Sequence, residues 1–242
     1  MAKSDETLEI SRRDVAMIQQ IMGRVVQGVS VPDFADAGAE DDGFVTMSPL
    51  DNGAGPAPQM GERPTQWRNI CWGRKGFELH PQFVEGVLWI ESELGLRADF
   101  LMACMMFESR LDPKARNPQS TASGLIQFMA QTAIELRTTI EKIRAMDAMT
   151  QLSYVYKYFR RFGSQMHDWD LADTYMAILW PKAIGEPADY HLFTRGEAAY
   201  KVNAGLDTDK DGFVTKKEAA AKVLKLYEEG LKSPNFGAVR IS

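Results

Sequence analysis

The chain has 242 residues, a formal net charge of −5 at pH 7, and a composition that is 45% hydrophobic and 25% charged. This is long enough for one or two domains with a sizeable core, and it argues against disorder throughout the chain. The acidic balance disfavours nucleic acid as the partner, because proteins that bind phosphate backbones generally carry a basic excess. Peptides, sugars and other proteins remain as candidate partners.

Two cysteines, Cys71 and Cys104, are too few for a disulfide framework and lack the spacing of a metal site. Cys104 lies inside the apolar run FLMACMMF and is expected to be a buried thiol. The N-terminal MAKSDETLEISRRD has no apolar segment of the kind that a secretion signal needs, and no apolar run is long enough to span a membrane. We therefore expect synthesis in the cytoplasm without a signal peptide, so a target outside the cytoplasm needs a separate route of delivery.

The first 66 residues are expected to form an N-terminal helix and an extended linker or arm. Apolar residues recur with a helical period over 9–29. Residues 30–66 are rich in Gly, Pro, Ala and Asp and hold no sustained period. Either the helix packs on the body of the protein and a long surface loop follows, or this region docks on a larger assembly.

From about residue 67 the apolar spacing is helical, and alternating strand patterns are almost absent. The fold is therefore predicted to be mainly α, with one domain over 67–232 and a C-terminal tail over 233–242. Helices are expected at 81–95, which opens with a proline suited to a first turn, and at 98–108, 130–150, 150–162, 170–179, 192–206 and 216–231.

The most apolar of these helices ends in a carboxylate. On a helix over 98–108, Leu101, Met105 and Glu108 share one face, which must be largely buried. Burial raises the pKa of a carboxyl group, so Glu108 is a candidate to hold a proton near neutral pH and to donate it. The alternative is a glutamate that reaches solvent at the helix end or pairs with Arg110.

The segment after Glu108 cannot continue the helix, because SRLDPKARNPQSTASG contains two prolines and several small polar residues. GLIQFM follows it. There Gly124 permits a close backbone approach, and Gln127 supplies an amide that both donates and accepts hydrogen bonds. Such groups are suited to binding sugars.

These two parts together, Glu-Ser-x-Leu-Asp-Pro at 108–113 and Ser-Gly-Leu-Ile-Gln-Phe-Met at 123–129, resemble the catalytic core of lytic transglycosylases and related lysozyme-like domains. Phage endolysins and virion-associated peptidoglycan hydrolases use the same core. The resemblance is clear over about 98–135 and looser over about 80–230. It implies a lysozyme-like helical fold that acts on peptidoglycan glycan strands in the periplasm or cell wall.

The resemblance implies that Glu108 is the general acid/base for the bond between N-acetylmuramic acid (MurNAc) and N-acetylglucosamine (GlcNAc). A transglycosylase closes a 1,6-anhydro ring on the muramoyl product, whereas a lysozyme of the same fold uses water, often with a second carboxylate. Substrate-binding roles are implied for a set of residues around Glu108: Ser109, Ser123, Gly124, Gln127 and Tyr175.

The sequence around Tyr175 departs from the family pattern. Thr-Tyr-Met-Ala-Ile stands at 174–178, where many transglycosylases have Ala-Tyr-Asn-Ala-Gly. The missing Asn and Gly leave the cleft geometry and the product open, and Tyr175 is alternatively a core aromatic residue. A second Glu-Ser pair, Glu91-Ser92, has no Gly-Leu-x-Gln after it, so Glu91 and Glu93 are expected to be solvated or paired along their helix.

Near the C-terminus, DTDKDGFVTKKE at 207–218 matches the twelve-residue EF-hand calcium loop at each diagnostic position. No second such loop is present and sensor hands normally occur in pairs, so we predict a structural Ca²⁺ that clamps the last two helices. A loop that kept its shape but lost useful affinity is the alternative. The expected ligands are Asp207, Asp209, Asp211, the backbone carbonyl of Phe213, Thr215 and Glu218.

Two classes of function follow from these features. The first is a peptidoglycan-cleaving enzyme, either a phage endolysin or a component of the virion. The second is a non-catalytic tail or baseplate component with a lysozyme-like fold. If the protein is part of a virion, contacts with other virion or tail proteins are expected through residues 1–66.

Overall fold

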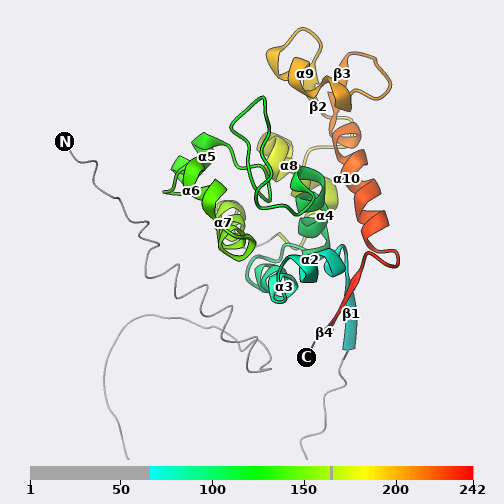
Figure 1. Cartoon of the computed structure of the whole chain (residues 1–242). Helices are drawn as coiled ribbons and strands as arrows, with labels where there is room; N and C mark the ends of the chain where they lie inside the picture. Colours follow the sequence, from blue (N-terminus) through cyan, green and yellow to red (C-terminus); the bar gives the residue numbers. More distant parts are fainter. Residues whose placement is uncertain (1–65, 164–165, 242) are drawn as a thin grey trace, which may run out of the picture.

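The computed structural model describes residues 66–163 and 166–241 (Figure 1). The helix expected over 9–29 and the arm that follows it lie outside the described residues. The described chain is mainly helical, which confirms the predicted fold class, and it also contains four short strands. None of its helices has both the length and the hydropathy of a membrane span.

The elements follow one another as β1 (Gln66–Ile70), α2 (Gly73–Leu79), α3 (Phe83–Leu94), α4 (Ala98–Ser109), α5 (Ala130–Glu135), α6 (Ile140–Ala145), α7 (Ala148–Arg160), α8 (Leu171–Leu179), the 3₁₀ turn η1 (Pro181–Ala183), β2 (His191–Thr194), α9 (Ala198–Asn203), η2 (Ala204–Leu206), β3 (Phe213–Thr215), α10 (Lys216–Gly230) and β4 (Gly237–Ile241).

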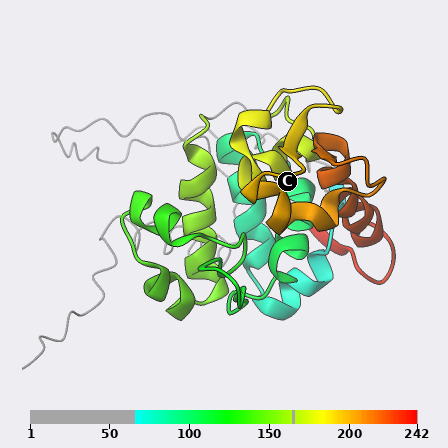
Figure 2. The same cartoon turned by 90° about the horizontal axis from the view of Figure 1, so that it is seen from above.

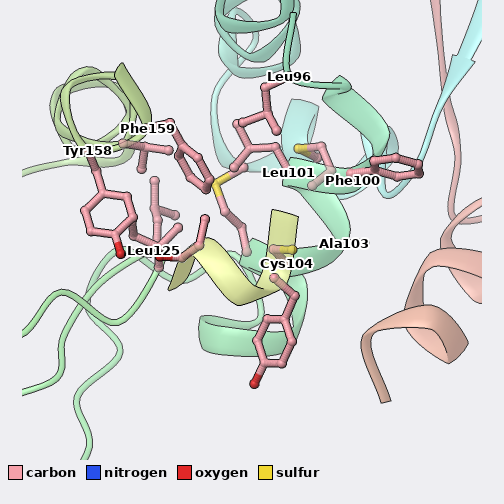
Figure 3. Close-up of a cluster of buried hydrophobic side chains, with 14 of the residues drawn as sticks. Leu96, Phe100, Leu101, Ala103, Cys104, Leu125, Tyr158 and Phe159 are labelled. Carbon is pink, nitrogen blue, oxygen red and sulfur yellow. Dashed lines mark hydrogen bonds between the residues drawn. The ribbon is translucent and has the colours of Figure 1, made fainter. Parts of the chain in front are cut away.

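Helix α4 forms the centre of the core. Every residue from Ala98 to Met106 is buried, which explains the unbroken apolar run in the sequence. Helices α3, α8 and α10 pack against it. Figure 3 shows part of the resulting cluster, with Leu101 and Cys104 from α4, Leu125 from the turn that follows it, and Phe159 from α7. Cys104 is a free, fully buried thiol, as expected.

The two ends of the described chain meet in a sheet. β1 and β4 pair antiparallel, from Gln66 opposite Ile241 to Ile70 opposite Gly237. Gly73 lies so close to the other chain end that an added Cβ would stand 2.7 Å from the nitrogen of Gly237. The segment expected as a C-terminal tail over 233–242 therefore contains a strand that completes the domain, and the boundary at 232 is not a structural one.

The single helix predicted over 192–206 is wrong. Residues His191–Thr194 instead form β2, which pairs antiparallel with β3, and Leu192 and Phe193 of this strand are buried. Gly196, with φ +103°, turns the chain before the short helix α9. Together β2, β3 and α9 form a small unit beyond the first turn of α10 (Figures 1 and 2).

The helix predicted over 130–150 is divided into α5, α6 and the beginning of α7. Arg137, with φ +58°, follows α5 in the left-handed region. The side chains of Thr139 and Asp147 then accept hydrogen bonds from the first turns of α6 and α7. These two N-caps fix new helix starts that the apolar spacing alone does not reveal.

Candidate active site

Glu108 lies in the last turn of the buried helix α4. The helix ends directly after it, because Arg110 and Leu111 both adopt left-handed backbone conformations, with φ of +58° and +62°. The amide of Arg110 donates to the carbonyl of Met106, and the side chain of Leu111 is buried. A packed helix therefore fixes the backbone of Glu108 at the point where the chain turns away.

The carboxyl group of Glu108 is half-buried, and burial raises its pKa to about 7. No acidic group in the described part of the chain adds to this shift. The alternative in which Glu108 pairs with Arg110 is not what the structure shows, because no ion pair joins these two described residues. Glu108 is thus a carboxyl group poised between its protonated and ionised forms near neutral pH.

Ser109 connects α4 to the turn formed by GLIQF. Its side chain is buried, and its hydroxyl is shared between the carbonyls of Met105 and Leu125, each 3.0 Å away. The hydroxyl is therefore engaged inside the protein. Through these two bonds Ser109 holds the turn beside Glu108.

The GLIQF turn is fixed from beneath by Gln151, which the sequence did not single out. Gln151 is fully buried on α7, and its Oε1 accepts a hydrogen bond from the amide of Leu125 at 3.0 Å. Its Nε2 donates to the carbonyls of Pro113 at 2.6 Å and Ile143 at 2.8 Å. Gly124, with φ +77°, is required here because an added Cβ would lie 2.4 Å from Gln151 Oε1.

Ser123 and Gln127 stand on either side of Gly124 and differ in exposure. Ser123 is fully buried, and its hydroxyl donates to the carbonyl of Thr121 and accepts from Nε of Arg144 at 2.9 Å. Gln127 is half-buried with φ +54°, and its Nε2 donates to the carbonyl of Gly124 at 3.1 Å. Of the two, Gln127 is the one that is partly exposed.

Tyr175 approaches the same site from α8. It is 2% exposed and its ring packs edge-on against Phe107, the neighbour of Glu108, with 5.4 Å between ring centroids. Burial raises the pKa of Tyr175 well above its ordinary value, and the nearby Glu108 carboxylate raises it further. Tyr175 is therefore a buried aromatic residue and also a neighbour of Glu108, so the two interpretations of its sequence are compatible.

The other Glu-Ser pair, Glu91-Ser92, contributes a glutamate to contacts that stabilise the fold. Glu91 is paired, but not along its own helix: it forms an ion pair with Arg68 of β1, which also contacts Asp99 at 2.9 Å. Oε1 of Glu91 accepts a hydrogen bond from the amide of Ala98 at 3.1 Å. These contacts tie β1 to the junction between α3 and α4.

The loop over 207–218, which leads into α10, brings three carboxylates together. One oxygen from each of Asp207, Asp209 and Asp211 lies within 4.8 Å of the others. Phe213 stacks on His191 of β2, with 4.3 Å between ring centroids. Thr215 caps the first turn of α10 and is thereby engaged with the amide of Glu218 at 3.2 Å.

Glu218 lies apart from the aspartate cluster. Its carboxylate accepts hydrogen bonds from the amide and hydroxyl of both Thr208 and Thr215. Burial pushes its pKa upward, but these four bonds outweigh burial and hold the pKa of Glu218 at about 2. The predicted ligand set is therefore only partly assembled, with three aspartates grouped and the glutamate bonded to two threonines.

A search of curated proteins found no match at a significant level. Residues 87–179 match the family model of the Transglycosylase SLT domain. The matched segment begins within α3 and ends with the last residue of α8, so it includes Glu108, the GLIQF turn and Tyr175 but neither the acidic loop nor the β1–β4 sheet. This mainly helical, lysozyme-like part of the chain is thus similar to the Transglycosylase SLT domain.

Proposed function

We propose that the protein is a lytic transglycosylase that cleaves the MurNAc–GlcNAc bond of peptidoglycan, with Glu108 as the general acid and then the general base. The observation that supports this is a carboxyl group with a pKa near 7 at the end of a buried helix, within a segment similar to the Transglycosylase SLT domain. A group with such a pKa is available in both protonation states near neutral pH, as the two steps require.

In the first step Glu108 donates its proton to the glycosidic oxygen, the bond from that oxygen to C1 of MurNAc breaks, and GlcNAc leaves with a free hydroxyl. The ionised Glu108 then takes the proton from the C6 hydroxyl of the muramoyl group. O6 bonds to C1 and closes the 1,6-anhydro ring. The proton count balances, and Glu108 returns to its protonated form.

The surrounding residues have supporting roles in this proposal. Gln127 is half-buried beside the site and supplies an amide to the sugar, while its Nε2 keeps the turn in shape. Ser109, Ser123 and Gly124 hold that turn through buried contacts. Tyr175 packs against Phe107 on the inner side of the site, next to Glu108.

The alternative enzyme is a muramidase of the same fold, which would give a hydrolysed product. A retaining hydrolase needs a second carboxylate about 5–5.5 Å from the first, and an inverting one needs it about 6.5–9.5 Å away. No neighbouring acid among the described residues contributes to the pKa of Glu108. This favours the transglycosylase, in which the C6 hydroxyl replaces both the water and the second carboxylate.

A non-catalytic virion component is the second candidate function, and the composition of residues 30–66 favours it as an assembly arm. The half-buried, unpaired Glu108 favours an enzyme instead, because a carboxyl group in this setting destabilises a fold that has no use for it. The two roles are compatible in one chain. We place the activity in the periplasm or cell wall. The protein would reach this location either as a phage endolysin or as part of a virion whose other proteins bind residues 1–66.

Digestion of purified peptidoglycan sacculi, followed by mass spectrometry of the released muropeptides, tests the proposal. Muropeptides with 1,6-anhydro ends are expected. Reducing ends would establish a muramidase instead. If the wild-type chain releases nothing while remaining folded, the non-catalytic role replaces both enzymatic ones.

A further inference from the structure

We propose that the loop over 207–218 binds one Ca²⁺ ion with Asp207 Oδ1 as its central ligand, and that Arg195 is the counter-charge that keeps the metal-free loop folded. This inference goes beyond the proposed function, because none of the residues involved belongs to the catalytic site. It rests on the unsatisfied oxygen of Asp207, on the two grouped aspartates beside it, and on the strand that supports them.

The first observation is an uncompensated buried oxygen. The side chain of Asp207 is 2% exposed, and its Oδ1 is buried with no hydrogen-bond partner. The other oxygen, Oδ2, is well supplied: it accepts from the hydroxyl of Tyr200 and from the amide of Gly212 at 3.2 Å, and it lies 3.7 Å from Nη2 of Arg195. A buried carboxylate oxygen is rarely left without a partner, so Oδ1 is oriented for a ligand that the protein itself does not provide.

The second observation is the negative charge beside Asp207. Asp209 and Asp211 bring one carboxylate oxygen each to within 4.8 Å of a carboxylate oxygen of Asp207 and of one another. Like charges at this spacing repel, and a cation at their centre reverses the sign of the interaction. These three carboxylates, with the carbonyl of Phe213 as the ligand that the sequence motif predicts beside them, form an all-oxygen set, which suits a hard cation of the size of Ca²⁺.

Strand β2 supports the loop, as a second EF-hand would in a paired arrangement. Phe213 and Val214 of β3 pair with Thr194 and Phe193 of β2. The amide of Arg195 donates to the carbonyl of Gly212 at 2.7 Å, and its Nη2 donates to the carbonyl of Lys210 at 3.0 Å. The loop is therefore held in a folded shape by a neighbouring strand of the same domain, and a single site is sufficient.

The guanidinium of Arg195 also limits the affinity of the loop for Ca²⁺. It lies beside Asp207 and contributes a positive charge to a cluster of three negative ones. This charge lowers the repulsion in the metal-free loop and opposes the entry of a cation. Glu218 opposes it as well, since its four hydrogen bonds to Thr208 and Thr215 must be given up before it can join the ligands. We therefore expect a dissociation constant weaker than about 10⁻⁶ M, outside the range of calcium buffers.

The bound ion would stabilise the whole domain through α10. Thr215 caps this helix, and the next residue, Lys216, is buried with its Nζ 2.6 Å from Asp173 of α8 and 2.7 Å from the carbonyl of Glu186. Helix α10 packs along α4 and α8. An ion that fixes the start of α10 thus opposes unfolding of the packed helices rather than of the loop alone.

Calorimetric titration of the chelator-treated full chain with CaCl₂, together with thermal unfolding in EGTA and in Ca²⁺, tests the proposal. One equivalent of Ca²⁺ is expected to bind, and Mg²⁺ is expected to bind more weakly. At about a hundredfold excess over the dissociation constant, Ca²⁺ should raise Tm by about 5–10 °C. Absence of both binding heat and a Tm shift up to about 5 mM Ca²⁺, with the chain folded, would overturn the proposal.

Four variants assign the effect to named residues. Asp207→Asn should lose Ca²⁺ binding and stay folded, whereas Asp168→Asn, at a side chain that is 85% exposed, should bind normally. Arg195→Gln should bind Ca²⁺ about threefold more tightly and have a lower Tm in EGTA, because both changes follow from the loss of one positive charge. If Arg195→Gln weakens Ca²⁺ binding instead, Arg195 is a support of Asp207 and not a competitor of the ion. Glu108→Gln should bind Ca²⁺ like the wild type, so a failure of the proposed catalysis leaves this test intact.

Discussion

Burial of the carboxyl group of Glu108 is unfavourable, and no partner in the described residues offsets it. The pKa of about 7 expresses that penalty, because the ionised form is destabilised relative to the protonated one. The residues around Glu108 are, by contrast, well satisfied: Ser109, Ser123 and Gln151 all have hydrogen-bond partners. Among these four side chains, Glu108 is the one whose pKa is raised by burial, and it is the one for which proton transfer is proposed.

Glu108→Gln keeps the shape of this side chain and removes the proton it can transfer. The release of muropeptides should fall by at least about 10²-fold, since general acid–base groups typically contribute about 10²–10⁴-fold. The matched control is Glu228→Gln on the exposed face of α10, which should retain wild-type activity. If the Glu108 variant retains more than about a tenth of the activity with an unchanged circular dichroism spectrum, Glu108 is not the proton donor.

The raised pKa of Glu108 also predicts a dependence of activity and stability on pH that the wild type has and Glu108→Gln lacks. Activity should fall as pH rises through about 7, because the donor form is lost. Between the unfolded pKa of 4.5 and the folded pKa of about 7, the folded state binds more protons than the unfolded one, so the free energy of unfolding decreases as pH rises. The Gln variant lacks this decrease and should be more stable than the wild type by about 1–3 kcal/mol at pH 8. Urea unfolding at pH 4.5 and pH 8 measures the difference, and an equal stability gap at both values would contradict the assignment.

At the scale of the elements, the apolar spacing predicted where helices lie better than where they begin and end. α3, α4, α8 and α10 fall within a few residues of their predicted ranges. The division of 130–150 depends on Thr139 and Asp147, whose capping bonds require a local backbone geometry that periodicity does not express. Strand β2 was missed because it is only four residues long and pairs with β3 across about 20 residues of chain, a contact that no local pattern reveals.

The candidate site, too, was only partly predictable from the local sequence. Glu108 and the GLIQF turn were predicted because they belong to a motif that can be recognised from the order of residues in the sequence. Gln151 was not found, although a glutamine amid the apolar face of 150–162 was the available signal. Its three hydrogen bonds join segments 26, 38 and 8 residues away, so its role depends on tertiary contacts.

Gly124→Ala tests how strongly the turn beside Glu108 depends on this packing. An alanine there adopts the left-handed region at φ +77° and also displaces Gln151, which leaves buried polar groups without partners. We expect a loss of about 2–4 kcal/mol in the free energy of unfolding. Gly185→Ala is the matched control, because its φ is also +77° but no atom lies within 4 Å of the added Cβ. Similar losses in both variants, measured by urea unfolding, would show that the contact with Gln151 adds nothing to the backbone cost.

At the scale of the whole molecule, the two ends of the described chain lie together, and the SLT-like segment is enclosed by elements outside the family match. β1 precedes the matched residues and β4 follows α10, yet the two strands pair over five residues. The amides of Trp72 and Arg74 add hydrogen bonds to the carbonyls of Gly230 and Asn235. Helix α10, which packs against the core helix α4, also lies outside the matched residues.

Two truncations separate the proposed arm from the structural sheet. Removal of residues 1–60 leaves β1 intact, so the shortened chain should be soluble and should release muropeptides at the wild-type rate. Removal of residues 237–242 deletes β4, exposes the unpaired edge of β1 and uncovers the close contact at Gly73. This second chain should unfold more than about 5 °C below the wild type, because five strand pairs and the buried Val239 are lost. Differential scanning calorimetry and the sacculus assay measure both effects. If the N-terminal truncation instead abolishes activity or solubility, residues 1–60 are part of the catalytic domain, and their proposed role in binding virion proteins must be abandoned.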